Sequence, residues 1–512
     1  MRNFFGKIFN GIFNRFTITA LFILLQLFYL CTMIFELVNY ADWVGFIFKG
    51  VTVISAIYIV WRDYNPAYKI GWIILIAVFP ILGGALYIMF GNKRPGKGIK
   101  KKIDPIENSH RFYLRQKDDI EKICKDVRRA ATIDYISKEG IYPAWSGTSS
   151  KYFERGERFF DSMIDDMKNA KHFIFLEYFI IKKGKLWNEI YEILKSKVKE
   201  GVEIRIIYDD IGSINHLPMN FVKKLKKDGI EVVVFNPMKP FLSLVYNNRD
   251  HRKICIIDGY IGYNGGANIG DEYVNLTSKL GHWKDSGIRL EGNAVWNLTV
   301  MFLNMWNSFR KTEDNYEPYG VHVHHKEPFQ SDGVVQPFSD TPLDEENLSE
   351  NVYLEILNSA KNYVYIYTPY LIIDNEMETA LKLAAKRGVD VRIVTPGIPD
   401  KKVVFFLSRS YYGNLIHAGV KIYEYAPGFI HAKSFVSDDK VAVVGTINID
   451  YRSLYLHFEC GTFLAESSTI KDIREDYEKT FKISREITES VLEGKWFDTA
   501  IAAILRVFSP IV

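Results

Sequence analysis

Two segments of the chain carry the same five positions at identical spacing. They read HRKICIIDGYIGYNGGAN from residue 251 and HAKSFVSDDKVAVVGTIN from residue 431, and both fit H-x-K-x4-D-x6-G-x2-N. A chance match at five specified positions is rare in a chain of this length, and two matches are rarer. The matching residues are His251, Lys253, Asp258, Gly265 and Asn268 in the first copy, and His431, Lys433, Asp438, Gly445 and Asn448 in the second. The chain is therefore expected to contain two copies of one structural unit.

The sequence before each motif repeats in the same order. GVEIRIIYDD from Gly201 corresponds to GVDVRIVTPG from Gly388, and DGIEVVVFNP ending at Pro237 corresponds to AGVKIYEYAP ending at Pro427. These segments alternate with helical patterns, which is typical of α/β folds. With 512 residues, 48% of them hydrophobic, the chain can build more than one core. We predict two α/β/α sandwich halves, 151–320 and 346–512, joined by a connection at 321–345 and related by a pseudo-twofold axis.

The motif strands are expected to place their polar residues together. Side chains two apart on a strand share a face, so His251 and Lys253 should project together, as should His431 and Lys433. The apolar run Ile254–Ile257 should anchor the first strand in the core. If the two halves pair about the pseudo-twofold axis, both motifs contribute to one site with two histidines and two lysines.

Residues 1–91 differ in composition from the rest. Apolar runs cover 17–35, 44–61 and 70–90, each long enough to span a bilayer. Basic residues precede the first run and follow the third, so the positive-inside rule places both ends of this region, and with them the two repeated halves, in the cytoplasm. Because that requires an even number of crossings, one run is expected to be re-entrant or interfacial, and Pro80 and Gly83 favour a bend in the third. We predict a helical, multi-pass anchor in the cell membrane, followed by a basic linker and connecting segment at 92–150; buried core helices are the alternative.

Several protein classes are disfavoured. The four cysteines lack metal-ligand spacing, so neither disulfides nor a zinc site is expected. A net charge of +4 and the lack of a basic stripe with interleaved aromatics predict no nucleic-acid partner. The segment VHVHHKE at 321–327 is interpreted as a solvated linker. No cofactor or metal is expected.

Two imidazoles at one site suit a displacement at phosphorus in two steps. One histidine attacks and forms a phosphoryl-enzyme bond, while the other protonates the leaving alkoxide and then deprotonates the incoming alcohol. Lys253 and Lys433 supply positive charge where charge grows on the non-bridging oxygens, and Asn268 and Asn448 supply amide donors as substrate-binding groups. The remaining members of the catalytic motif, Asp258 and Asp438, are expected to brace the strand and its loop by hydrogen bonds.

These motifs resemble the phospholipase D superfamily, and together with the N-terminal apolar region they are most similar to bacterial cardiolipin synthases. The resemblance covers nearly the whole chain and includes YDDIGS from 208, RDHRK from 249, TPYLI from 368, PGFIHAK from 427 and NIDYRSLYLHFE from 448. It implies metal-independent transfer of a phosphatidyl group from one phosphatidylglycerol to the terminal hydroxyl of another, releasing glycerol. The implied partners are this anionic phospholipid and the membrane; the oligomeric state is not indicated.

The resemblance also implies residue roles. His251 would be the nucleophile and His431 the acid and base, with the reverse still open. In similar enzymes an acidic residue beyond the motif orients each histidine: Asp285 would serve His251, and Glu459 would serve His431. His457 stands where similar proteins often have Asn.

Other functions stay open on the sequence. A phospholipase D, or a synthase that uses phosphatidylethanolamine, would share the chemistry. An inactive lipid-binding scaffold is disfavoured because both polar sets are intact, and a metal-dependent CDP-alcohol transferase would need aspartates that residues 1–90 lack. The interval from Pro237 to His251 is ten residues longer than its counterpart, and its apolar residues predict a lid or membrane-dipping loop, with a loop packed on the fold as the alternative. The proposed lid residues are Phe241, Leu242, Leu244, Val245 and Tyr246.

Overall fold

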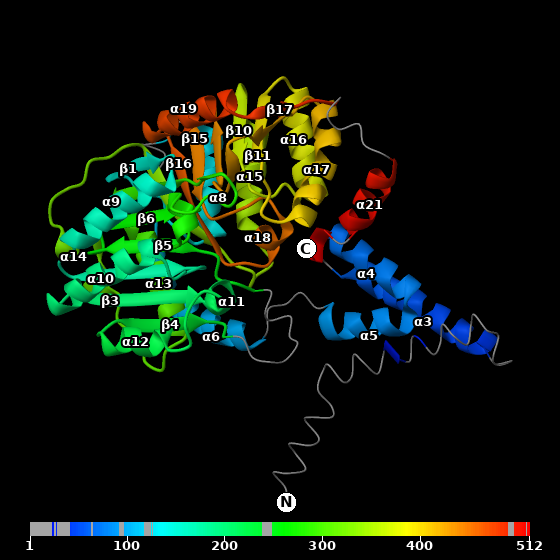
Figure 1. Cartoon of the computed structure of the whole chain (residues 1–512), viewed down its shortest axis with the longest axis horizontal. Coiled ribbons are helices and arrows are strands. Elements are labelled where there is room, and N and C mark those ends of the chain that lie inside the picture. The colour runs from blue at the N-terminus through cyan, green and yellow to red at the C-terminus, as the bar shows by residue number, and fades with distance from the viewer. Residues whose placement is uncertain are drawn as a thin grey trace, which may run out of the picture. The chain divides into compact units, whose positions relative to one another are not determined.

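The computed structural model describes residues 23, 24, 27, 41–62, 65–91, 97–116, 124, 126–237, 248–489, 496–507 and 509–511. The chain divides into two compact units. One contains the N-terminal helices and the C-terminal end, and the other contains both motif copies (Figure 1). The predicted lid residues lie outside the described residues.

The N-terminal unit contains the helices α3 (Ala41–Trp61), α4 (Pro66–Val78) and α5 (Pro80–Phe90), the part of α21 (Trp496–Val507) from Ala500 onward, and the short 3-10 helix η5 (Ser509–Ile511). The predicted apolar run 44–61 lies within α3. The run 70–90 is divided between α4 and α5 by Pro80, which takes the first position of α5 and cannot donate the backbone hydrogen bond that would continue α4. The predicted bend is thus confirmed. A Cβ atom on Gly83 would lie 2.5 Å from the Leu75 carbonyl oxygen, so glycine permits the close approach of α4 and α5.

The run 17–35 lies outside the described residues except for Ile23, Leu24 and Leu27. Among the residues that are described, no helix combines the length and the apolar character required to cross a membrane.

Within the described ranges, each half of the larger unit is built on one mixed sheet. The first sheet has seven strands in the order β1-β8-β6-β5-β2-β3-β4, and the second has eight in the order β17-β12-β11-β10-β14-β15-β16-β9. The first-half strands are β1 (Thr148–Phe153), β2 (Phe173–Tyr178), β3 (Glu203–Asp209), β4 (Glu231–Phe235), β5 (Lys253–Ile257), β6 (Ile261–Gly265) and β8 (Gly287–Gly292). The second-half strands are β9 (Val334–Asp340), β10 (Tyr363–Tyr367), β11 (Asp390–Pro396), β12 (Lys421–Tyr425), β14 (Ser434–Ser437), β15 (Val441–Gly445), β16 (Glu459–Ala465) and β17 (Arg485–Ile487). Apart from β17, the strands match one to one, which confirms the predicted repeat.

The connections of each sheet bring the motif to one edge. β2, β3 and β4 run parallel, and the motif strand β5 runs antiparallel to β2 with Lys253 opposite Tyr178. In the second half β14 runs antiparallel to β10 with Ser434 opposite Tyr367. The start of each motif strand therefore lies at the carboxyl edge of the parallel strands, where α/β sheets commonly form their sites.

Helices cover both faces of the first sheet. They are α9 (Gly156–Asn169), α10 (Lys185–Lys199), α11 (Asp210–Ser213), α12 (Phe221–Lys227) and α13 (Val295–Ser308). Phe302 of α13 stacks on Phe175 of β2 with ring centroids 4.7 Å apart. The neighbouring Ile174 and Leu176 point to the other face and join a buried cluster with residues of α9 and α10.

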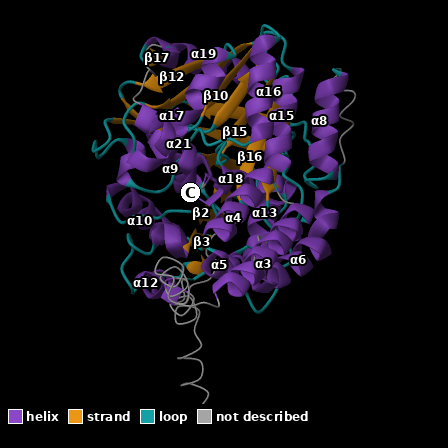
Figure 2. Cartoon of the chain, turned by 90° about the vertical axis from the view of Figure 1, so that its right-hand side faces the viewer, coloured by secondary structure: helices purple, strands orange, loops and turns teal. Residues whose placement is uncertain are grey.

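The second sheet is covered in the same way by α15 (Leu348–Ser359), α16 (Asn375–Lys386), α17 (Lys402–His417), α18 (Tyr451–Tyr455) and α19 (Thr469–Lys482). Tyr353 of α15 stacks on Phe435, with ring centroids 3.9 Å apart. The side chain of Ser434, the residue before Phe435, contacts α19 instead: its hydroxyl lies 2.8 Å from the hydroxyl of Tyr477. Neighbouring strand residues point to opposite faces, so each half is an α/β/α sandwich, as predicted (Figure 2).

Two segments differ from the predicted organisation. The predicted connection 321–345 includes β9, which pairs with β16 at the edge of the second sheet, so the second half begins earlier than residue 346. Residues from Ala500 group with the N-terminal helices. The linker also contains α6 (Lys97–His110), η1 (Arg111–Leu114) and α8 (Val127–Lys138), and the connection contains α14 (Val321–His324). The 3-10 helix η4 (Glu317–Tyr319) lies at the end of the predicted first half.

Candidate active site

The two motif histidines lie immediately before the central strands, in segments without regular secondary structure. β5 begins at Lys253, and all of its residues are buried, as predicted for the apolar run that anchors it. β14 begins at Ser434, just after Lys433. The histidines themselves are nearly buried, with 7% of His251 and 8% of His431 exposed.

Backbone hydrogen bonds from the opposite half position each histidine. The His251 N–H donates to the carbonyl oxygen of Phe458 at 2.9 Å, and the His431 N–H donates to that of Lys284 at 2.7 Å. Lys284 ends the short strand β7 (His282–Lys284), which pairs with β13 (Gly428–Ile430). In both cases the residue that follows the acceptor is acidic, so the same contact that places a histidine also places a carboxylate beside it.

The resulting histidine–carboxylate pairs are exchanged between the halves. His251 Nδ1 lies 2.8 Å from Glu459 Oε1, and His431 Nδ1 lies 2.7 Å from Asp285 Oδ2. The predicted pairing of Asp285 with His251 and of Glu459 with His431 is therefore wrong. Each half supplies a carboxylate to the histidine of the other half, and such reciprocal contacts are expected when two units are related by a twofold axis.

The two carboxylates are held differently. Glu459 also accepts hydrogen bonds from the hydroxyls of Thr446 and Ser453. Asp285 accepts one from the backbone N–H of Ser286 at 2.9 Å. Gly266 occupies the motif position that corresponds to Thr446, and a Cβ atom there would lie 2.2 Å from Asp285 Oδ1. The first motif therefore leaves space where the second supplies a hydroxyl.

Burial and hydrogen bonding favour neutral imidazoles beside ionised carboxylates. Burial lowers the pKa of His251 to about 3 and that of His431 to about 4. Burial alone would raise the pKa values of Glu459 and Asp285, but their interactions with His251 and His431 hold both below the usual range. A neutral imidazole that donates its Nδ1 proton to a carboxylate keeps a lone pair on Nε2.

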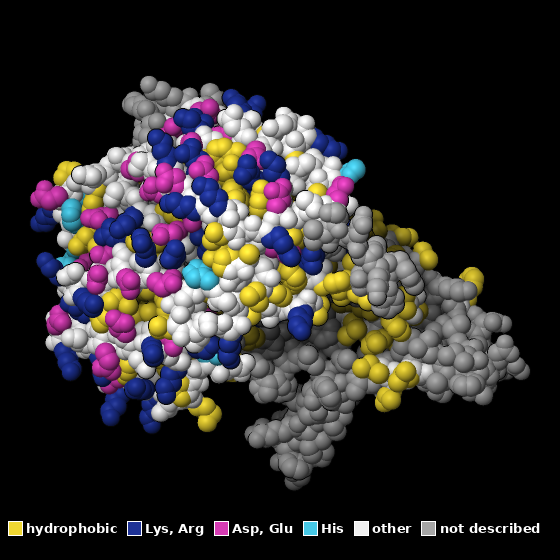
Figure 3. Space-filling model, turned by 45° about the horizontal axis from the view of Figure 1, so that its top comes forward, with side chains coloured by type: hydrophobic (Ala, Val, Ile, Leu, Met, Phe, Trp, Pro, Cys, Tyr) yellow, Lys and Arg dark blue, Asp and Glu magenta, His cyan; other side chains and the backbone are white. Residues whose placement is uncertain are grey.

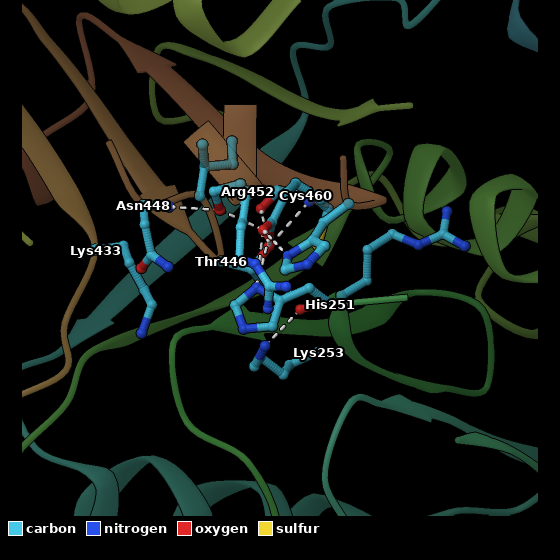
Figure 4. A network of polar contacts seen from close by, with 12 residues as sticks. His251, Lys253, Lys433, Thr446, Asn448, Arg452 and Cys460 are labelled. Carbon is cyan, nitrogen blue, oxygen red and sulfur yellow. Dashed lines mark hydrogen bonds and ion pairs between the residues drawn. The ribbon is translucent and has the colours of Figure 1, made fainter. Parts of the chain in front are cut away.

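Both motif lysines fold back on the histidine segments. Each Nζ donates to a histidine carbonyl oxygen, Lys253 to that of His251 and Lys433 to that of His431. Burial lowers the pKa of Lys253 to about 8 and that of Lys433 to about 7. Lys433 and Asn448 of the second half lie next to each other at the site that holds His251 (Figure 4). The lysines thus bring positive charge to the histidines of both motifs.

The two motif asparagines have different surroundings. Asn268 Oδ1 accepts from the Ile180 N–H at 2.9 Å, and its amide donates to the Tyr273 hydroxyl at 2.9 Å. The side-chain oxygen of Asn448 is buried and has no hydrogen-bond partner within the described part of the chain. The amide group of Asn268 is therefore engaged by the protein itself, whereas Asn448 keeps an unsatisfied polar atom beside Lys433.

The motif aspartates brace the fold, as predicted. Asp258 accepts hydrogen bonds of 2.7 to 3.0 Å from the backbone N–H groups of Lys171, His172 and Phe173. Asp438 does the same for residues 361, 362 and 363 at 2.8 to 2.9 Å. Both lie just past the ends of β5 and β14 that are remote from the histidines. They tie the motif strand to the start of β2 or β10 and make no contact with the histidines.

Sequence reasoning missed two residues around Glu459, Thr446 and Ser453, and it named His457 only as a departure from the Asn of similar proteins. The hydroxyl of Thr446 sits inside the repeated motif, at a position where the two copies differ, and that difference was the available signal. The possible ligand atoms of His251, His457 and Glu459 all lie within 4.8 Å of one another. Among the described residues, this is the group whose composition and spacing suit a metal ion.

Comparisons with known proteins agree with this geometry. A family model described as "Cardiolipin synthase, PLD-like domain" matches residues 163–291 and 353–482, one match to each half. A second model, "Phospholipase_D-nuclease N-terminal", matches residues 50–92.

Relatives match along most of the chain. A cardiolipin synthase from Alkalihalophilus pseudofirmus is 34% identical over 471 residues, which cover 91% of this chain and 93% of the relative. An uncharacterized protein from Streptococcus mutans is 43% identical over 462 residues, or 90% of this chain and 99% of that protein. The crystal structure of a phosphatidylserine synthase from Haemophilus influenzae has a TM-score of 0.55 at 13% identity, covers 74% of this chain and 97% of its own, and shows a common fold. The repeated motif, the two matched halves and these relatives show that the chain belongs to the phospholipase D-like cardiolipin synthase family.

Proposed function

We propose that this protein is a cardiolipin synthase, which transfers the phosphatidyl group of one phosphatidylglycerol to the terminal hydroxyl of another and releases glycerol. The observation that carries the proposal is the pair of exchanged histidine–carboxylate contacts, His251 with Glu459 and His431 with Asp285. Each contact occupies Nδ1 and leaves Nε2 for chemistry. Family membership supports the same activity.

The first step forms a covalent intermediate. His251 Nε2 attacks the phosphorus of a bound phosphatidylglycerol, and the bond from phosphorus to the glycerol oxygen breaks. His431 donates a proton to that oxygen, so glycerol leaves as the alcohol. The anionic phosphodiester favours the protonated form of His431 once it is bound, because an opposite charge raises the pKa of an imidazole.

The second step reverses the proton transfer. His431 takes the proton from the hydroxyl of a second phosphatidylglycerol, and that oxygen attacks the phosphorus while the bond to His251 Nε2 breaks. Lys253 and Lys433 would stabilise charge on the non-bridging oxygens, together with the amide of Asn448. The amide N–H of Asn268 already donates to the Tyr273 hydroxyl, which supports Asn448 rather than Asn268 in this role. Asp285 and Glu459 act as positioning residues, and Asp258 and Asp438 as structural ones.

The proposed reaction takes place at a membrane surface, with the larger unit in the cytoplasm. Exposed apolar side chains on the N-terminal helices support membrane association, among them Phe46, Ile54 and Trp61, which are 79%, 69% and 76% exposed. Apolar side chains gather over the described residues of this unit (Figure 3). Contiguous exposed apolar surface commonly marks a membrane or protein interaction site.

One assay tests the proposal. Purified full-length protein is mixed with phosphatidylglycerol vesicles and a chelator, and cardiolipin and free glycerol are measured. We expect the two products in equal amounts. Cardiolipin without glycerol, or phosphatidic acid in place of cardiolipin, would overturn the proposed reaction, and the second result would indicate transfer to water.

A further inference from the structure

His457 is a third histidine at the proposed site, and the transfer reaction leaves it without a role. Its ring centroid lies 5.5 Å from that of His251. Its Nδ1 lies 3.7 Å from Glu459 Oε1, which is longer than a hydrogen bond, and is buried without a hydrogen-bond partner in the described residues. An unsatisfied buried nitrogen that faces an ionised carboxylate is arranged to receive a cation.

We propose that His251, His457 and Glu459 form a binding site for Zn²⁺ or a similar transition-metal ion, and that the bound ion inhibits the transferase. This inference rests on the proposed function. Two imidazoles and one carboxylate are a common Zn²⁺ ligand set. Tetrahedral coordination at Zn–N and Zn–O distances of about 2.0 to 2.1 Å separates ligand atoms by about 3.3 Å. The two measured separations from Glu459 Oε1, 2.8 Å to His251 and 3.7 Å to His457, flank that value.

The charges around His457 favour a cation on this side of His251. Asp450 interacts electrostatically with His457, and the carboxylate of Glu459 lies 3.7 Å from its Nδ1. Lys253 and Lys433 are opposing charges that both interact electrostatically with Glu459, and the ammonium of Lys253 donates to the His251 carbonyl oxygen. The His457 side chain is 12% exposed, so its edge connects the cluster to solvent.

Metal binding would inhibit by changing the His251 tautomer. Zn²⁺ accepts the lone pair of His251 Nδ1, so the single ring proton moves to Nε2 and no redox change occurs. Nε2–H has no lone pair with which to attack phosphorus. At the same time Glu459 becomes a metal ligand and no longer accepts the Nδ1 proton. The bound ion thus blocks the first step without taking part in it.

Metal binding itself can be measured without turnover. Chelator-treated full-length protein is titrated with Co²⁺, whose visible spectrum is intense when four-coordinate. We expect one such Co²⁺ per chain in the wild type, its loss in His457→Asn and its retention in His322→Asn. His322 is an exposed histidine in the connection between the halves, which makes its substitution the matched control. Equal binding by the wild type and His457→Asn, or loss in His322→Asn alone, would overturn the proposed site.

Inhibition is then measured on phosphatidylglycerol vesicles. We expect Zn²⁺ to inhibit the wild type reversibly and the Zn²⁺ concentration for half-inhibition to rise at least about tenfold in His457→Asn, since one of three protein ligands is lost. His457→Gln serves as a second variant if the first one melts early. Unchanged inhibition in both variants would overturn the regulatory role. A protein that binds Co²⁺ but makes no cardiolipin without metal would instead contradict the proposed function, so the two failures are distinguishable.

Discussion

The exchange of carboxylates between the halves predicts which histidine each one serves. We expect Glu459→Gln to reproduce the kinetic defect of His251→Ala, and Asp285→Asn to reproduce that of His431→Ala, because each acid contacts the histidine of the other motif. Removing the charge from a charge-assisted hydrogen bond of this kind costs about 1.5 to 3 kcal/mol. In the transition state that is roughly a 10- to 150-fold loss of rate. The histidine variants themselves should lose far more.

Two phosphatidyl donors separate the two types of defect. Phosphatidylglycerol needs a proton on its leaving oxygen, whereas a phosphatidyl nitrophenol does not, because nitrophenolate is a stable anion. The rate of the nitrophenolate burst is measured with the second donor. Variants of the acid pair, His431 and Asp285, should regain activity on this donor, and variants of the nucleophile pair, His251 and Glu459, should stay defective. We expect His431→Ala and Asp285→Asn to recover together and His251→Ala and Glu459→Gln to fail together.

The comparison does not depend on which histidine attacks. If His431 is the nucleophile and His251 the acid, the two members of each pair still behave alike, and the exchanged pairing of histidines and carboxylates is still supported. Recovery of Glu459→Gln together with His431→Ala, when Asp285→Asn fails like His251→Ala, would refute the exchanged pairing. Glu459→Ser removes the carboxylate entirely and serves as the control for any hydrogen bond that the amide of Glu459→Gln retains.

Three further outcomes follow from the geometry. Asp258→Asn weakens hydrogen bonds to three backbone N–H groups, so thermal melting should show about 1.5 to 3 kcal/mol of destabilisation while the folded enzyme keeps its kcat. Burial lowers the pKa of His251 to about 3 and that of His431 to about 4. As the pH falls, these histidines therefore bind protons in the unfolded chain before they do so in the folded protein. The contribution of the neutral histidines to the free energy of unfolding is complete above about pH 6.5 and is lost as the pH falls toward 4. The melting temperature should therefore fall less steeply across that range in His431→Asn than in the wild type. Gly266→Ala places a Cβ atom 2.2 Å from Asp285 Oδ1, so kcat should fall at least about tenfold while KM changes little, and an unchanged kcat would show that the carboxylate can shift freely.

The sequence predicts the repeat, the sandwich halves and the two histidine–lysine pairs because each depends on local pattern and short spacing. The partner of each histidine depends instead on a contact between residues 208 positions apart, His251 with Glu459, and no local pattern specifies it. β9 lies within the predicted connection, and its strand contains Pro337. An edge strand tolerates proline, and β9 pairs at an edge of its sheet. His457 differs from the Asn expected by resemblance, but only the structure brings its ring near His251.

The stereochemical course at phosphorus tests the central claim most directly. A phosphatidylglycerol made chiral at phosphorus with oxygen isotopes is converted to cardiolipin, and the configuration of the product is determined. Transfer through a phosphohistidine consists of two in-line displacements, each of which inverts phosphorus, so the account predicts overall retention. Overall inversion would show a single direct displacement and would contradict the two-histidine mechanism.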